Sequence, residues 1–111
     1  MLNEEDYLGL CEALEGRNLQ ALWWSTEDFS DDFSSRHLLF LRLLGRLMEE
    51  GRIRLAKHGK FLESTVDEQL ELFRQVFPKT EAEMEDGIWF FDEICPGGAV
   101  WVLEDGSFEW T

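Results

Sequence analysis

The acidic segment from residue 26 to residue 32 holds the side chains best suited to recognising a partner. It carries four carboxylates within six positions, and the rings of Phe29 and Phe33 interrupt them. Carboxylates on one loop could receive lysine and arginine side chains from a partner while the phenyl rings act as anchors. The same residue types also cap and solvate the start of a helix, and the spacing of a calcium loop is absent.

Two adjacent tryptophans precede this segment, in a short stretch with helical character. Neighbouring residues of a helix point about 100° apart, so at least one of the two indole rings should lie near the surface. That ring is a candidate anchor for a protein interface, because tryptophan is enriched among the residues that dominate binding energy. The predicted partner-binding residues are Trp23, Trp24, Glu27, Asp28, Phe29, Asp31 and Asp32.

Catalytic chemistry has weaker support. The chain has only two imidazoles, His37 and His58, and neither belongs to a recognisable motif with a serine or cysteine nucleophile. Asp92 and Glu93 follow an aromatic run, where burial could raise the pKa of a carboxyl group, although such carboxylates are more often exposed charges at the end of a strand. We therefore predict no catalytic residue, and an enzyme that uses carboxylates remains an alternative.

Cysteine usage gives no sign of a metal site or a disulfide framework. Cys11 and Cys95 are far apart in sequence, form no CxxC motif and have no neighbouring histidine. We expect both to be reduced and mostly buried. No metal ion and no cofactor is predicted.

The charge balance excludes one class of partner and favours another. The 111 residues include 24 acidic and 10 basic side chains, for a net charge of -14, although residues 36–60 are locally basic. A phosphate backbone would be repelled by most of the molecule, so nucleic-acid binding is not expected, whereas a basic protein would be attracted. The first ten residues lack the features of a signal peptide, and no stretch suits a membrane span, so we expect a cytoplasmic protein.

A long apolar helix over residues 35–50 must organise the elements that position these side chains. Apolar residues cover more than half of its circumference, and Leu44 is expected at its centre. Ser34 or Ser35 could cap its start, and Gly51 suits the left-handed residue that closes a helix. With 44% hydrophobic residues, the chain should fold as one domain, residues 1–111.

Three further helices are predicted, over residues 4–15, 18–24 and 66–77. Asn3 and Asn18 are suited to capping the first two, and Thr65 with Glu68 forms a capping box for the third. Thr80 begins one or two more helical turns, which we expect Met84 to anchor.

The remaining residues predict antiparallel strands. His58 and Gly59 suit the turn of a hairpin over residues 53–62 that pairs Ala56 with Phe61. The main sheet is predicted from strands over residues 88–94, 99–104 and 107–111. A two-residue turn at Asp105 and Gly106 would pair Trp101 with Trp110 and place both on one face. The fold class is therefore α+β, with helices packed on an antiparallel sheet; whether the hairpin joins that sheet is left open.

Three stretches together resemble a known family: LLGRLMEEGRIRLAKHGKFLE, VDEQLELFRQVFP and GIWFFDEICPGGAVWVLEDGSFEWT. They are similar to the bacterial domain of unknown function 596 family, whose members are small uncharacterised proteins. The resemblance covers roughly residues 34–111 and is most specific over residues 95–101. It implies no catalytic residue. Families of this kind are associated, through genomic context, with the immunity proteins of contact-dependent toxin systems.

These observations lead to three functional hypotheses. The first is an acidic protein-binding domain, of the kind that inhibits a basic bacterial toxin such as a nuclease, because an acidic inhibitor would associate rapidly with a basic active site. The second is a small hydrolase-like enzyme that uses carboxylates. The third is a regulatory or assembly domain that forms a homodimer through an edge of its sheet.

Overall fold

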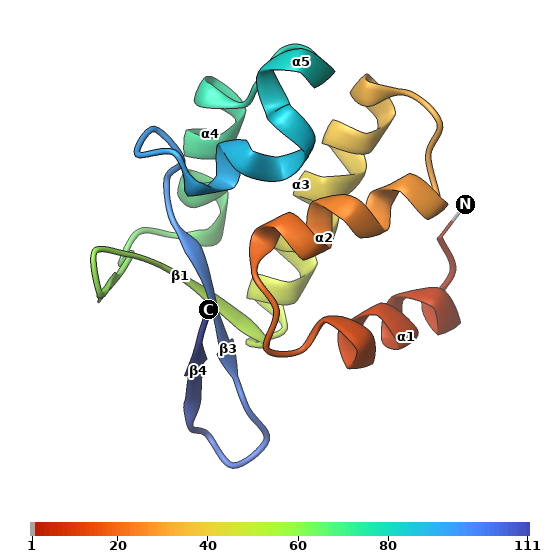
Figure 1. Ribbon diagram of the computed structural model, residues 1–111. Coiled ribbons are helices and arrows are strands. Elements are labelled where there is room, and N and C mark those ends of the chain that lie inside the picture. The colour runs from red at the N-terminus through yellow and green to blue at the C-terminus, as the bar shows by residue number, and fades with distance from the viewer. Residues whose placement is uncertain (1) are drawn as a thin grey trace.

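The fold is α+β, with helices packed around one long helix and a small curled sheet at one end (Figure 1). The computed structural model describes residues 2–111. The helices are α1 (Glu4–Leu14), α2 (Leu19–Ser25), α3 (Phe33–Glu49), α4 (Val66–Val76) and α5 (Glu81–Met84), with 3-10 helices η1 (Thr26–Asp28) and η2 (Glu85–Phe91). The strands are β1 (Ile53–Lys57), β2 (Lys60–Phe61), β3 (Gly98–Val102) and β4 (Phe108–Trp110).

Helix α3 lies at the centre of the core, as predicted. The side chains of Phe40 and Leu44 are 0% exposed, and Gly51 adopts a left-handed φ of 74° just after the helix ends. The predicted serine caps are wrong. Asp32 caps the helix instead, because its Oδ1 accepts a hydrogen bond of 2.8 Å from the amide of Ser35.

The local signals for the other helices are confirmed. Asn3 caps α1 in a reciprocal pair with Asp6, and Thr65 caps α4 in the same way with Glu68. Thr80 caps α5, and Met84 is only 1% exposed, so this short helix is anchored as expected. Each of these caps satisfies amides that the first turn of a helix leaves free, which makes them readable from sequence.

The hairpin of β1 and β2 has the predicted register, and it joins the main sheet. Ala56 lies opposite Phe61, and the turn residues His58 and Gly59 both have positive φ, as the hairpin turn requires. β1 also pairs with β3, so the four strands are ordered β2-β1-β3-β4.

The predicted register between β3 and β4 is wrong by one residue. Leu103 donates its amide to the carbonyl of Ser107, so the loop has three residues rather than two, and its last residue, Gly106, has a φ of 87°. A hairpin that combines a turn with a left-handed glycine in this way is the common three-residue type. One added residue moves every later side chain to the other face of the sheet. Trp110 therefore lies opposite Val100, and it does not pair with Trp101.

The predicted strand over residues 88–94 is also wrong. Asp86 and Gly87 have positive φ, and the chain then forms the 3-10 turns of η2. This turns two rings of the aromatic run inward: Trp89 lies 5.3 Å from the ring of Phe77, and Phe90 lies 5.2 Å from the ring of Phe40, measured between centroids. The run is apolar because it covers the helical core, and it takes no part in the sheet.

The sheet curls so strongly that its two edge strands meet across the outer face. The ring of Phe61 on β2 lies 5.0 Å from Phe108 and 5.1 Å from Trp110, both on β4. In a flat sheet these strands would lie about 14 Å apart, since neighbouring strands are roughly 4.8 Å apart. On this face Val100, which lies opposite Trp110, is 2% exposed, whereas Phe108 and Trp110 are half-exposed.

Candidate functional site

The structure separates the two adjacent tryptophans. Trp23 is 1% exposed and packs against the rings of Phe33 and Phe40, so it is a core residue. Trp24 is 41% exposed, and its Nε1 donates to the carbonyl oxygen of Asp86 at 2.9 Å and to the Oδ1 of the same residue at 3.2 Å. Trp24 is thus a surface ring held in one orientation.

The acidic segment lies next to Trp24 but does not act as one unit. Glu27, Asp28 and Asp31 are exposed. Asp32 is engaged in capping α3, so its carboxylate has a structural role. Phe29 is half-buried and lines a hollow described below. Within residues 2–111, none of these four carboxylates forms an ion pair with a basic side chain.

A buried arginine, Arg36, donates hydrogen bonds to the residues at the start of the acidic segment, and sequence reasoning did not identify it. Arg36 is 6% exposed; its Nε donates to the hydroxyl of Thr26 at 3.0 Å and its Nη2 donates to the carbonyl of Trp23 at 3.2 Å. Its guanidinium also lies 4.2 Å from the centre of the Trp23 ring. A buried charge with several hydrogen-bond partners fixes its surroundings, so Arg36 holds Thr26, the first residue of η1, against the end of α2. No local signal in the sequence distinguishes Arg36 from Arg42 and Arg46 on the same helix, which are more exposed.

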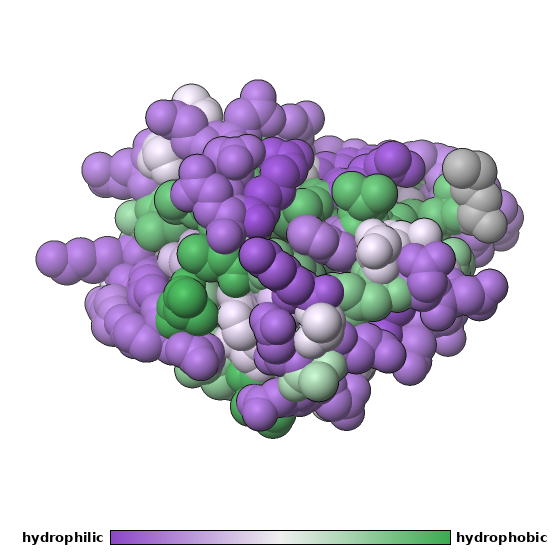
Figure 2. All heavy atoms as spheres, turned by 90° about the horizontal axis from the view of Figure 1, so that it is seen from above, coloured by the Kyte–Doolittle hydropathy of each residue, from purple (hydrophilic) through white to green (hydrophobic). Residues whose placement is uncertain are grey.

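An apolar row on η2 and in the turn after it is the second feature that sequence reasoning missed. Ile88 and Phe91 lie on η2, are 54% and 63% exposed, and are three residues apart, the spacing that aligns side chains in a 3-10 helix. Ile94, which is 54% exposed, follows in the turn after η2. We call these three residues the η2 apolar row. Figure 2 views the molecule from the side of α5 and η2 and shows apolar side chains exposed among hydrophilic ones. The three-residue spacing is present in the sequence, but the predicted strand over residues 88–94 does not align these side chains on one face.

The η2 apolar row is surrounded by carboxylates and is linked to Trp24. Glu85, Asp86, Asp92 and Glu93 flank it and are exposed. The link is Asp86, whose carbonyl oxygen accepts a hydrogen bond from the indole of Trp24. Asp86 lies two residues before Ile88, the first residue of the row. The structure thus brings together an exposed ring predicted from sequence and an apolar row that was not.

Of the side chains considered for catalysis, the structure brings together only the exposed pair His58 and Glu93 within residues 2–111. Asp92 is exposed, and Glu93 pairs with His58 at 2.8 Å between Oε1 and Nε2. His37 stacks on Phe77 with 4.0 Å between ring centres; burial, together with the charge of Arg74, lowers its pKa. Both cysteines are free and buried, and burial raises the pKa of the Cys95 thiol to about 11.

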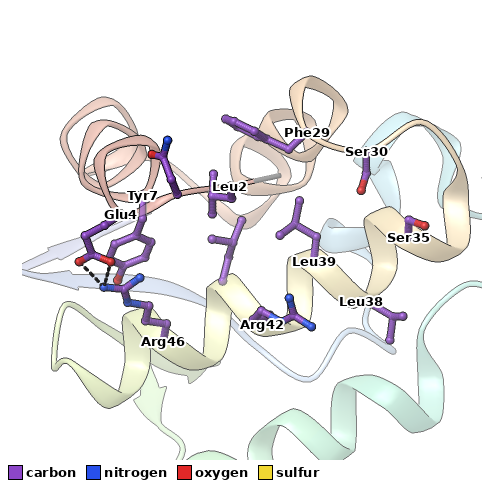
Figure 3. Close-up of a pocket in the computed structure, with 12 residues that line it drawn as sticks. Leu2, Glu4, Tyr7, Phe29, Ser30, Ser35, Leu38, Leu39, Arg42 and Arg46 are labelled. Carbon is purple, nitrogen blue, oxygen red and sulfur yellow. Dashed lines mark hydrogen bonds and ion pairs between the residues drawn. The ribbon is translucent and has the colours of Figure 1, made fainter.

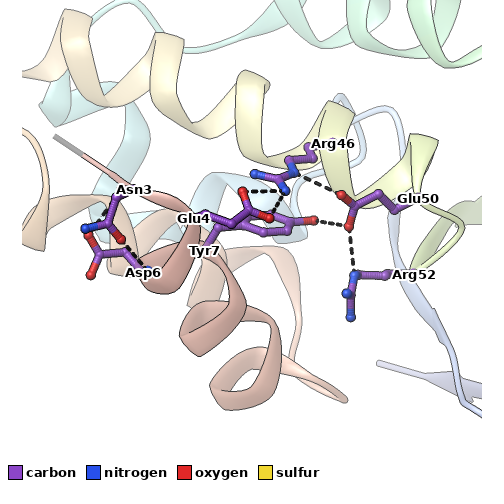
Figure 4. Close-up of polar contacts among 7 residues, drawn as sticks. All are labelled: Asn3, Glu4, Asp6, Tyr7, Arg46, Glu50 and Arg52. Atoms are coloured by element: carbon purple, nitrogen blue, oxygen red, sulfur yellow. Dashed lines mark hydrogen bonds and ion pairs between the residues drawn. The ribbon is translucent and has the colours of Figure 1, made fainter.

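Glu50 is the centre of a polar cluster that ties three elements together (Figure 4). Its carboxylate accepts from the Nε of Arg46 at 2.9 Å, the Nε of Arg52 at 2.9 Å and the hydroxyl of Tyr7 at 2.8 Å. Hydrogen bonds from the two arginines and the tyrosine lower the pKa of Glu50 to about 2. Burial, and then the bond to Glu50, raises the pKa of Tyr7. This cluster joins α1, the end of α3 and the start of β1, so its role is structural.

A hollow of about 570 Å³ lies between the start of α1, the 29–30 segment and α3 (Figure 3). In Figure 3, Phe29 and Leu39 face one another across the hollow, and Leu38 and Arg42 lie at its rim. Arg42 is exposed and forms no hydrogen bond or ion pair with any residue that the structure describes. The lining residues are Leu2, Asn3, Glu4, Tyr7, Phe29, Ser30, Ser35, Leu38, Leu39, Arg42, Leu43 and Arg46.

Among residues 2–111, no group of three or more histidine, cysteine, aspartate or glutamate side chains is arranged to hold a metal ion. None of the helices in this range is long and apolar enough to cross a membrane.

Comparison with known proteins places the chain in a family. No curated protein matches the sequence. A solved structure of an uncharacterised protein conserved in bacteria, from Neisseria meningitidis, is similar over 96% of this chain and 90% of its own, with 31% sequence identity and a TM-score of 0.80. The family model described as "Protein of unknown function, DUF596" matches residues 48–111, which is more than half of the chain. The chain therefore belongs to the DUF596 family.

Proposed function

We propose that this protein is an acidic protein-binding domain that recognises a basic partner through Trp24, the carboxylates beside it and the η2 apolar row. The observation that carries the proposal is the fixed, exposed ring of Trp24, which Asp86 holds in place among carboxylates. A partly exposed, immobilised aromatic ring loses little freedom when a partner covers it, which suits it to anchor an interface.

The charges around this surface favour a basic partner. Within residues 2–111, no basic side chain pairs with Glu27, Asp28, Asp31, Glu85 or Asp86. Carboxylates without partners repel one another, and a cationic surface relieves that repulsion on binding. The net charge of -14 adds long-range attraction, which raises the rate of encounter with a basic protein.

The specific form that we propose is an intracellular inhibitor of a basic bacterial toxin, of the immunity type. A nuclease toxin must attract nucleic acid, so its active site presents the positive charge that this surface would meet. Support comes from the acidic and aromatic character of the surface. The partner is then a cationic protein domain rather than a nucleic acid.

The test begins with tagged protein purified from its native host and identification of the protein that co-elutes. Association and dissociation rates with that partner are then measured by surface plasmon resonance at low and physiological salt. Replacing Glu27 by glutamine and Asp28 and Asp31 by asparagine should slow association several-fold at low salt and have less effect at high salt. Asp32 is kept, because it caps α3.

A matched control separates the surface from the net charge. Replacing Glu63, Glu71 and Glu104 by glutamine changes the charge by the same amount with exposed residues elsewhere. Trp24→Ala should mainly speed dissociation, by roughly tenfold or more for an anchor ring. If no basic protein co-purifies, or if both triple variants slow association equally, this surface is not the recognition site.

A second candidate, homodimerisation, is favoured by one observation on the sheet. Phe108 and Trp110 are 45% and 49% exposed on β4, which forms one edge of the sheet. An exposed aromatic edge strand can pair with the same strand of a second copy. Light scattering after size exclusion would detect the dimer, and Trp110→Lys should return it to a monomer. A monomer at high protein concentration would exclude this candidate.

A further inference from the structure

The hollow beside α3 has the size and lining of a small-molecule site. Its volume of about 570 Å³ falls within the range of roughly 300–1,000 Å³ found for ligand pockets. It follows α3 from Ser35 to Arg46, a length of about 16 Å at 1.5 Å per residue. Apolar side chains form most of its walls: Leu2, Phe29, Leu38, Leu39 and Leu43.

One cation at the rim of this hollow has no partner in residues 2–111. Arg46, one turn further along α3, is fully engaged: its Nη2 donates to both carboxylate oxygens of Glu4 at 2.6 and 2.8 Å, and its Nε donates to Glu50. Among residues 2–111, Arg42 forms no side-chain hydrogen bond and no ion pair, although the chain carries 24 acidic side chains. No acidic residue lies three or four positions away from Arg42 on α3, where it could pair along the helix.

We propose that this hollow binds a small amphiphile that carries a single carboxylate, with its head at Arg42 and its apolar tail between Phe29 and Leu39. A planar guanidinium matches the two oxygens of a carboxylate. A singly charged head also suits the site better than a phosphate monoester, because each further negative charge is repelled by a protein with a net charge of -14. Covering Leu38, which is 65% exposed, adds apolar burial at the rim.

Two of the carboxylates around the hollow already have partners, and Asp28 and Asp31, next in sequence to Phe29 and Ser30, are exposed to solvent, where salt screens their repulsion of the head. Glu4 is neutralised by Arg46, and the carboxylate of Asp32 is engaged with the amide and hydroxyl of Ser35, at the other end of the hollow from Arg46. The ligand head would therefore lie between the ion pair of Glu4 with Arg46 and an apolar wall, with Arg42 as the lining cation that has no partner among residues 2–111. The hollow shares Phe29 and Ser30 with the acidic segment, but the ligand proposed here does not depend on the partner proposed above.

Sodium decanoate is the probe for this proposal, used well below its micelle concentration. Titration into the ¹⁵N-labelled protein should shift the amide signals of Phe29, Leu38 and Leu39 saturably with one site per chain. Acetate has the charge without the tail, and 1-decanol has the tail without the charge, so both should bind at least about tenfold more weakly. Arg42→Gln should also raise the dissociation constant of decanoate by about tenfold, the loss of one charge-assisted hydrogen-bonded contact.

A neighbouring arginine provides the matched control. Arg74 lines a second hollow, of about 440 Å³, on the other side of α3, which Arg42 also borders. Arg74→Gln should leave decanoate binding unchanged, and the melting temperature of Arg42→Gln should equal that of the wild type because Arg42 has no partner to lose. Any one of three results would overturn the proposal: no saturable binding, equal binding by Arg42→Gln, or equal weakening by Arg74→Gln. A homodimer that Leu38→Lys dissociates would also overturn it, since a second copy would then cover the hollow.

Discussion

Replacing Leu44 by alanine tests whether α3 is the centre of the fold. The substitution removes three carbon atoms from a side chain that is 0% exposed. At about 0.8 kcal/mol per buried methylene, transfer alone costs roughly 2.4 kcal/mol. The cavity left in a tightly packed core raises the expected loss in the free energy of unfolding to between about 2.5 and 5 kcal/mol.

Leu38→Ala is the matched control for this loss. Leu38 lies six residues earlier on the same helix and loses the same three carbons, but it is 65% exposed. Its replacement should change stability by less than about 0.5 kcal/mol, as exposed substitutions generally do. Because alanine has the higher helix propensity by only a small margin, the difference between the two variants reports burial rather than helix formation.

Urea denaturation followed by tryptophan fluorescence and by circular dichroism measures both variants. The wild type and both variants should show the same denaturant slope, so that the midpoint alone reports stability. The melting temperature of Leu44→Ala should fall by roughly 10 °C or more, at about 4 °C per kcal/mol for a domain of this size. A loss below about 1 kcal/mol, or equal losses at both positions, would refute the central placement of α3.

Three further predictions concern the polar and backbone features of the fold. Glu50→Gln should destabilise the protein at pH 7. The difference in stability from the wild type should shrink as the pH falls from about 4.5 towards about 2, because the Glu50 carboxyl has a lower pKa in the native state than in the unfolded chain. Urea midpoints across that pH range measure the difference, and a constant difference would contradict the prediction. The pKa of His37 is lowered in the native state, so the unfolded chain takes up the proton first and stability should fall as the pH drops below 6.5. His37→Phe keeps the stacking on Phe77 and should reduce that loss of stability. An unchanged profile of stability against pH would show that another group is responsible. Gly106→Val should lower the free energy of unfolding by about 1 kcal/mol or more, because a φ of 87° is unfavourable for a β-branched residue. A Cβ added at Gly106 would meet no atom within 4 Å, so the cost comes from the backbone conformation. An unchanged melting temperature would mean that the loop has a different conformation.

Helix starts were the best-predicted features, because capping depends on residues three positions apart. Asn3, Asn18, Thr65 and Thr80 all cap helices as expected. The predicted cap of α3 was wrong, because Asp32 rather than Ser34 or Ser35 accepts the hydrogen bond from the free amide of the first turn. The register of the first hairpin followed in the same way from His58 and Gly59, whose positive φ values are a local requirement of the turn.

The candidate surface could be predicted only in part. Exposure of one tryptophan of the adjacent pair followed from helix geometry, but its identity as Trp24 depends on how α2 is rotated against α3. A strand over residues 88–94, as the sequence predicts, would place Ile88 and Phe91 on opposite faces, so the η2 apolar row is not recognisable from that prediction. The hydrogen bond from Trp24 to Asp86, which links α2 to η2, joins residues 62 positions apart in the sequence.

The sequence by itself determined the fold class, the helices with their caps, the acidic surface charge and the membership of a family. These properties depend on composition and on neighbours along the chain. Only the tertiary structure decided the conformation of the aromatic run, because a short apolar stretch is equally compatible with a buried strand and with helical turns. It also decided the register of the last hairpin, where Trp101 is buried and donates its Nε1 to the carbonyl of Arg17 at 2.8 Å. The physical reason is the same in both cases: local turn chemistry permitted two conformations of similar free energy, and contacts between residues far apart in the sequence selected one of them.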